Sequence, residues 1–195
     1  MFLEQPKHKK PLKGWIEVVC GSMFSGKTEE LIRRLKRARI ARQNVMIFKP
    51  QTDKRYDETK VVSHDDNRIP STPVANAKEI LNLVKEVDVI GIDEAQFFGQ
   101  DLIEVSEKLA NNGVRVIIAG LDLDFLGKPF GPMPNLLAVA EYITKVHAIC
   151  ISCGDLAHNS YRTVEDEKLI VLGEKESYLP LCRDCFNRET NPEKK

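Results

Sequence analysis

A single stretch, residues 21–28, constrains the fold of this chain more than any other. It matches the pattern G-x-x-x-x-G-K-[ST] and reads Gly21-Ser22-Met23-Phe24-Ser25-Gly26-Lys27-Thr28. The apolar, β-branched run 15–20 precedes it and the amphipathic segment 29–42 follows it, so the pattern lies between an expected strand and an expected helix. In that setting successive backbone N–H groups wrap around phosphate oxygens. The chain therefore predicts a phosphate-binding loop (P-loop); a simple glycine turn is the alternative.

The alternation of strand and helix signals continues along the chain. Further strands are expected at 45–48, 61–62, 87–92, 114–119 and 142–149, and helices at 76–86, 101–112 and 135–141. Asn76 is the expected N-cap of the helix at 76–86. Continuously apolar strands that alternate with helices indicate a parallel sheet with helices on both faces. The predicted fold class is α/β.

Two carboxylates, Asp93 and Glu94, directly follow the buried run 87–92. The carboxyl ends of parallel strands face the crevice in which α/β proteins bind ligands. With a phosphate loop upstream, Asp93 is predicted to hold Mg²⁺ together with Thr28, while Lys27 reaches the β- and γ-phosphates of ATP. Glu94 is predicted to act as a general base. A helix cap or a solvated turn is the alternative, and the pair does not decide whether water or an alcohol accepts the phosphate.

Four cysteines form two C-x-x-C pairs, Cys150 with Cys153 and Cys182 with Cys185. Two such pairs can supply four thiolates in a tetrahedron, the closed geometry of structural zinc. Redox dithiols and disulfides are the alternatives, and a reducing compartment disfavours disulfides. The sequence thus predicts a structural Zn²⁺ site without a catalytic role.

The helical periodicity ends at the first cysteine pair, which divides the chain. We expect a main domain at 15–149 and a zinc-binding domain at 150–186, between a disordered lead-in at 1–14 and a disordered tail at 187–195. The lead-in is basic but has no apolar run after its lysines, and no stretch is long enough to span a bilayer. The expected location is the cytoplasm, without a membrane partner.

The overall charge of the chain bears on whether nucleic acid is its partner. The chain has 29 Lys and Arg residues and 29 Asp and Glu residues, and a protein that coats nucleic acid is usually basic. A nucleic-acid-dependent ATPase nevertheless stays an alternative, supported by one basic helix face formed by Arg33, Arg34, Lys36, Arg37, Arg39 and Arg42. A non-enzymatic zinc-binding interaction module is a third interpretation, which the phosphate loop and the carboxylate pair disfavour.

Five motifs taken together resemble the cytosolic, or type II, thymidine kinases. They are the segments 21–31, 93–98, 120–125 and 128–131, and Tyr178 four residues before Cys182. The resemblance runs from about residue 15 to 186 and implies a RecA-like P-loop domain joined to a small zinc-ribbon, or lasso, domain. It implies transfer of the ATP γ-phosphate to the 5′-hydroxyl of thymidine, with deoxyuridine as a second substrate. It also implies a homotetramer that dTTP inhibits, and no nucleic-acid partner.

The resemblance also implies roles for single residues. Glu94 is similar to the family's catalytic base, Asp53 to a residue on the metal side and Arg55 to a residue that stabilises the transferring phosphoryl group. The ATP site would comprise residues 21–28 with Asp93, Glu94, Ala95 and Gln96. The thymine would be surrounded by Met23, Phe97, Leu121, Phe125, Phe130, Val171 and Tyr178, the last two on the lasso at 171–178.

Core packing is the alternative reading for the apolar members of this set, and for Leu121 the sequence alone prefers it. We further expect the cysteine site to restrict the lasso loop. Because the phosphate loop lies in the other domain, Cys182→Ser is expected to weaken thymidine binding more than ATP binding.

Overall fold

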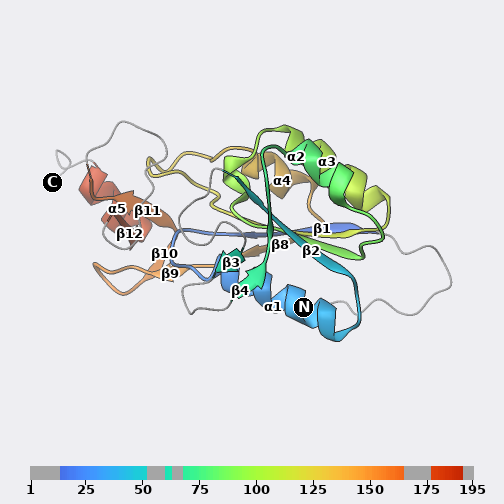
Figure 1. Cartoon of the computed structure of the whole chain (residues 1–195). Coiled ribbons are helices and arrows are strands. Elements are labelled where there is room, and N and C mark those ends of the chain that lie inside the picture. Colours follow the sequence, from blue (N-terminus) through green and yellow to red (C-terminus); the bar gives the residue numbers. More distant parts are fainter. Residues whose placement is uncertain (1–13, 52–59, 63–67, 165–176, 191–195) are drawn as a thin grey trace.

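The computed structural model describes residues 14–51, 60–62, 68–164 and 177–190, and its main body is a six-stranded sheet (Figure 1). The strand order is β5-β2-β6-β7-β1-β8 and every pairing is parallel. The strands are β1 (Trp15–Cys20), β2 (Val45–Pro50), β5 (Thr72–Val74), β6 (Val89–Ile92), β7 (Arg115–Gly120) and β8 (Tyr142–Lys145). The α/β prediction with a parallel sheet is confirmed.

Helices cover both faces of this sheet. On one face lies α1 (Lys27–Ile40), and on the other lie α2 (Ala77–Leu83), α3 (Asp101–Asn111) and α4 (Met133–Val139) (Figure 1). Two separate apolar clusters form beneath them, and neighbouring residues of β7 divide between the two. Ile117 packs with Leu35 on the α1 side, whereas Ile118 packs with Leu102 on the α3 side. A strand buried on both faces must be apolar at successive positions, which explains its continuous run.

The helix expected at 76–86 begins as predicted and ends early. Asn76 is its N-cap, because the Asn76 side chain accepts a hydrogen bond from the Glu79 backbone N–H at 3.2 Å. The helix stops at Leu83, since the next residues turn the chain into β6. Asn44 fixes that turn: its side chain donates to the Glu86 carbonyl at 3.1 Å, and its own carbonyl accepts the Asp88 N–H at 3.0 Å.

The single strand expected at 142–149 is wrong, because two strands share this run. β8 ends at Lys145, and β9 (Ala148–Ile149) pairs with β10 (Leu156–Ala157) in an antiparallel hairpin. The chain leaves the sheet at Val146, whose N–H donates to the Cys20 carbonyl at 2.8 Å where β1 itself ends. One apolar stretch therefore serves two structural units.

The second unit, called here the C-terminal unit, runs from β9 to α5. It contains β9, β10, the antiparallel pair β11 (Asn159–Arg162) and β12 (Tyr178–Leu181), and α5 (Arg183–Thr190). Residues 187–190 thus form the end of a helix, although disorder was expected from 187. The remaining residues of the expected tail, and residues 1–13 of the lead-in, lie outside the described residues.

Two shorter elements complete the described chain. β3 (Lys60–Val62) and β4 (Arg68–Pro70) form an antiparallel pair, which confirms the short strand expected at 61–62. A 3₁₀ turn, η1 (Ala95–Phe97), follows the carboxylate pair. Among the described residues, no helix has both the length and the apolar character needed to cross a bilayer.

Candidate functional site

The phosphate-loop sequence forms a tight turn between β1 and α1. Gly26 lies in the left-handed region at φ 84° and caps the helix. Gly21 is required for a different reason: a Cβ atom there would lie 2.1 Å from the Val146 carbonyl oxygen. Because α1 starts at Lys27, the positive N-terminal end of the helix dipole lies at this loop, a position that favours an anion.

The Ser22 carbonyl oxygen accepts two side-chain hydrogen bonds inside this turn. Lys27 Nζ donates to it at 2.7 Å, and Ser25 Oγ donates to it at 2.7 Å. The lysine thus lies along the loop that would surround a phosphate. These two hydrogen bonds join Ser22, Ser25 and Lys27 within the predicted phosphate loop.

Thr28 and Asp93 meet although 65 positions separate them in the sequence. Thr28 Oγ1 lies 3.3 Å from Asp93 Oδ2 and 3.4 Å from Oδ1, and the Asp93 side chain is buried. Asp93 is also fixed from its own strand end, because Oδ1 accepts the Glu94 N–H at 3.0 Å. A hydroxyl and a carboxylate beside a phosphate cradle are hard oxygen donors of the kind that Mg²⁺ uses together with nucleotide phosphates, so these residues fit the ion.

Glu94 has an unusual backbone at φ 52° and ψ 41°, the left-handed region that few residues other than glycine adopt. Such conformations persist only where the surrounding structure enforces them, and they concentrate at functional sites. Gln96 contacts the side chain of Glu94: its Nε2 donates to Glu94 Oε2 at 2.5 Å, and its Oε1 accepts the Leu121 N–H at 2.9 Å. The prediction that Gln96 contacts ATP stays a prediction, and its side chain also joins Glu94 to Leu121.

The aromatic residues predicted around the base fall into two groups. Phe97 and Phe130 meet edge to face with ring centroids 5.9 Å apart. Phe125 lies under the Arg162 guanidinium, whose carbon is 3.5 Å from the ring centroid, and Arg162 donates to the Tyr178 hydroxyl at 3.1 Å.

Arg162 is buried and was missed by sequence reasoning. An arginine beside an aromatic residue gives no recognisable signal until β11 and β12 pair. Asp53, Arg55 and Val171, which the resemblance implicated, lie outside the described residues.

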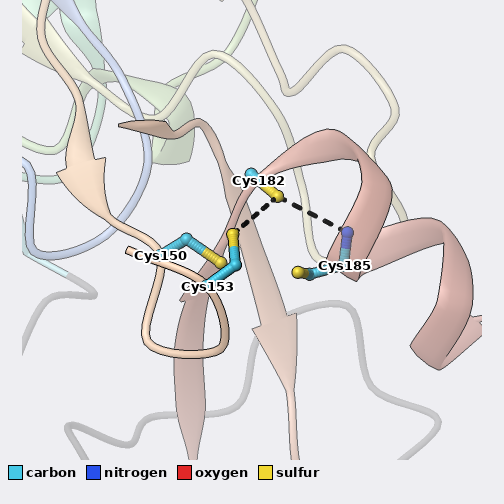
Figure 2. Close-up of side chains that lie close together, drawn as sticks. All are labelled: Cys150, Cys153, Cys182 and Cys185. Carbon is cyan, nitrogen blue, oxygen red and sulfur yellow. Dashed lines mark hydrogen bonds between the residues drawn. The ribbon is translucent and has the colours of Figure 1, made fainter. Parts of the chain in front are cut away.

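The four cysteines converge in the C-terminal unit (Figure 2). Cys150 and Cys153 lie on the turn between β9 and β10, Cys182 follows β12, and Cys185 lies in α5. Their sulfur atoms all lie within 4.8 Å of one another, and Cys153 Sγ is 3.6 Å from Cys182 Sγ. A tetrahedral zinc with Zn–S bonds of about 2.3 Å has sulfur–sulfur edges of about 3.8 Å, so the cluster fits zinc.

The protonation of this cluster also suits a cation. Burial raises the pKa of the Cys150 thiol, but backbone N–H groups of Cys182, Cys153 and Ser152 outweigh it and bring the pKa to about 6. For Cys153, the Asp155 backbone lowers the pKa, but the neighbouring cysteine sulfurs together outweigh it and raise the pKa to about 12. Crowded thiolates repel one another, and a divalent ion removes that repulsion. Arg188 also donates to Cys185 Sγ at 2.9 Å, which places a positive charge against the cluster.

The basic helix face that supported a nucleic-acid motor is partly occupied within the chain itself. Arg33 Nε lies 2.6 Å from Glu30, and Arg34 is buried with its guanidinium 2.7 Å from Glu17 and 2.7 Å from Glu30. A buried, paired guanidinium is unavailable to a phosphate backbone. Of the six basic residues, Arg34 therefore serves the fold, whereas Arg33 pairs with Glu30 at the surface.

Comparisons with known proteins cover both units. A family model described as thymidine kinase matches residues 14–186. The chain is 60% identical over 188 residues to a thymidine kinase of Bacteroides thetaiotaomicron, covering 96% of this chain and 94% of that protein. It is 61% identical over 180 residues to a thymidine kinase of Porphyromonas gingivalis (92% and 88% covered) and 54% identical over 180 residues to one of Bdellovibrio bacteriovorus (92% and 88% covered).

Proposed function

The chain belongs to the thymidine kinase family, and from that premise we propose that it transfers the γ-phosphate of ATP to the 5′-hydroxyl of thymidine at the carboxyl edge of the parallel sheet. The observation that carries this proposal is the contact of Thr28 with Asp93 beside the enforced backbone of Glu94. In support of the proposal, the predicted phosphate loop, two oxygen donors and the Glu94 carboxylate, which accepts a hydrogen bond from Gln96, lie near one sheet edge. A phosphoryl transfer needs little more than this positioning and charge.

The chain's own groups divide the work as follows. Backbone N–H groups of the loop and Lys27 bind the β- and γ-phosphates. Glu94 accepts the proton of the 5′-hydroxyl as its oxygen bonds to the γ-phosphorus, and the bond to the β,γ-bridging oxygen breaks to release ADP. Gln96 keeps the Glu94 carboxylate turned toward the site through its 2.5 Å hydrogen bond.

Thr28 and Asp93 would hold Mg²⁺, with Asp53 as a further ligand and Arg55 beside the transferring phosphoryl group. When bound, the ion neutralises phosphate charge. The support for Thr28 and Asp93 is their 3.3 Å approach, and the support for Asp53 and Arg55 is the motif resemblance.

The thymine would lie among the predicted set of Met23, Phe97, Leu121, Phe125, Phe130, Val171 and Tyr178. The edge-to-face pair Phe97 and Phe130 supports this, because flat ring faces and edges suit a planar base. Deoxyuridine is proposed as a second substrate, since a methyl group in an apolar pocket discriminates by only about 1–3 kcal/mol.

Three wider proposals rest on the family resemblance. The protein would form a homotetramer, dTTP would inhibit it, and it would work in the cytoplasm on nucleosides destined for DNA synthesis. The four-cysteine cluster would hold a structural zinc, which its closed set of four sulfur ligands supports.

Glu94→Gln tests the assignment of the base. The substitution keeps the side-chain shape and removes the proton acceptor, so we expect turnover at saturating substrates to fall about 10²–10⁴-fold. Binding of Mg²⁺ and a non-hydrolysable ATP analogue should stay close to wild type. Glu104→Gln is the matched control, because Glu104 is 76% exposed on α3. Near-normal dTMP formation by the Glu94 variant would show that another group is the base.

A further inference from the structure

We infer that the C-terminal unit holds the phosphate loop in its working shape, and that Ser160 is the positioning residue through which it does so. The inference rests on the proposed function, in which this loop binds ATP. It concerns a side chain on β11 that makes no contact with the substrates in the proposal above.

The key contact is a hydrogen bond across the two units. The Met23 N–H in the middle of the loop donates to Ser160 Oγ at 2.9 Å, and 137 positions separate the two residues. Ser160 is 4% exposed, so water competes little for this hydroxyl. Buried hydrogen bonds of this kind fix backbone geometry, because breaking them leaves a polar group unpaired.

The same peptide group is fixed on its other side from within the loop. The Met23 N–H and the Ser22 carbonyl belong to one planar peptide, and that carbonyl receives Lys27 Nζ and Ser25 Oγ, each at 2.7 Å. Rotating the peptide would break all three bonds at once. Ser160 therefore determines the direction of the carbonyl that holds Lys27.

Two further contacts join the loop to the same unit. Ser22 Oγ donates to the Ala157 carbonyl at 3.4 Å. Phe24, which lies in the left-handed region at φ 62°, packs against the apolar cluster that contains Cys150, Cys182 and Phe186. Three consecutive loop residues are thus attached to the C-terminal unit, and the attachment includes the residue with the least favourable backbone.

A loop held in this way is organised before the nucleotide arrives. If the peptide sampled other orientations, only the competent fraction of molecules would bind, and the apparent affinity would fall by that fraction. The inference therefore differs from the expectation that Cys182→Ser affects thymidine binding more than ATP binding, because the C-terminal unit contacts the predicted ATP loop directly.

The test is the affinity of Ser160→Ala for an ADP or a non-hydrolysable ATP analogue with Mg²⁺, measured by calorimetry without thymidine. Omitting thymidine matters, since Met23 also belongs to the proposed base site. Loss of one buried hydrogen bond should weaken binding about 3- to 10-fold. Ser160→Thr keeps the hydroxyl and suits a strand, so it should restore the affinity.

Ser106→Ala is the matched control, because Ser106 is equally buried and its hydroxyl bonds to the Leu102 carbonyl within α3. It should lower thermal stability without changing nucleotide affinity. Zinc content should be equal in all variants.

If wild type binds the analogue and Ser160→Ala binds it equally well, the inference is overturned while the proposed function stands. Failure of Ser160→Thr to restore affinity, or loss of zinc from Ser160→Ala, would also overturn it, because the hydroxyl would then act on the fold of the unit. If wild type itself binds no analogue, the proposed function is overturned and the inference with it.

Discussion

The sheet unit and the C-terminal unit are stabilised by different means. The sheet buries long aliphatic side chains on both faces, such as Leu35 and Ile117 under α1 and Leu102 and Ile118 under α3. The C-terminal unit has one small cluster: Ala148, Cys150, Ala157, Leu181, Cys182, Cys185 and Phe186. Three of these residues are cysteines, and so small a core cannot offset the entropy of ordering its loops. The difference teaches that the sheet unit is stabilised by burial, whereas the C-terminal unit depends on its cysteine cluster, the site of the proposed zinc.

The largest expected effect comes from removing the metal site. Structural zinc typically contributes about 10–16 kcal/mol of apparent binding free energy, and for the zinc proposed here this would be folding free energy of the C-terminal unit. Cys182→Ser should abolish stoichiometric zinc and expose the amides of β9 to β12 to hydrogen exchange, while those of β1, β6 and β7 stay protected. Because Ser160 and Ala157 belong to that unit, ATP affinity should fall together with thymidine affinity.

Asp184→Asn is the control for this variant, since Asp184 is exposed between the two cysteines of the same pair. It should retain zinc and activity. Two outcomes would contradict the contrast in how the two units are stabilised. One is unchanged hydrogen-exchange protection of β9 to β12 in Cys182→Ser, and the other is wild-type protein purified without zinc.

A smaller loss of stability is expected when the buried carboxylate of the sheet unit is removed. Glu17 on β1 is buried and lies 2.7 Å from Arg34 and 2.6 Å from Arg115. Removing one partner of a buried ion pair typically costs about 3–5 kcal/mol, so Glu17→Gln should lower the free energy of unfolding by that order without loss of zinc.

The pH dependence gives this prediction a second readout. Burial raises the pKa of Glu17, but hydrogen bonds and charge from Arg115, with Trp15 and Arg34, outweigh it and hold the pKa below its ordinary value of 4.5. The stabilisation is therefore fully present above pH 4.5 and is lost as the pH falls through the lower, folded pKa. The free energy of unfolding of wild type, measured with urea between neutral and acidic pH, should show this loss. For Glu17→Gln this free energy should change less steeply with pH. Equal slopes would contradict the assignment.

The smallest expected loss of stability comes from removing the N-cap of α2, which belongs neither to the cysteine cluster nor to the apolar core. Asn76→Ala removes the side chain that accepts the Glu79 N–H, so α2 should lose about 1 kcal/mol of stability. Asn76→Asp keeps the acceptor and should be nearly neutral. A loss in Asn76→Asp as large as that in Asn76→Ala would mean that the cap is not the cause.

Local signals explain which parts of the molecule the sequence could predict. The phosphate loop is contiguous, the strands are continuously apolar, and the Asn76 cap depends on residues three positions apart. The four cysteines were also predictable as a set, because a metal requirement shows in spacing even before the fold is known. The left-handed backbone of Glu94 gave no such signal, since glutamate is uncommon in that conformation.

The features that escaped prediction depend on contacts between distant segments. The hydrogen bond joins the backbone N–H of Met23 to Ser160, 137 positions away, and nothing in the sequence around either residue indicates it. The division of the run 142–149 follows from where β1 ends. The helical residues 187–190 look like a polar tail, but they continue a helix that buries Phe186 and sets Arg188 against Cys185.

The passage through Val146 has a consequence for how this molecule could be cut or recombined. The Val146 N–H donates to the carbonyl at the end of β1 and the Val146 carbonyl lies close to Gly21, so this residue packs directly against the phosphate loop. Domains that can be exchanged usually meet at exposed linkers crossed by few contacts. The described residues 142–164 contain no such linker. A fragment ending after β8 would therefore lack the residues of the C-terminal unit that contact its phosphate loop. A chimera that exchanges the C-terminal unit between relatives would have to take β10, β11 and the phosphate loop from the same parent protein.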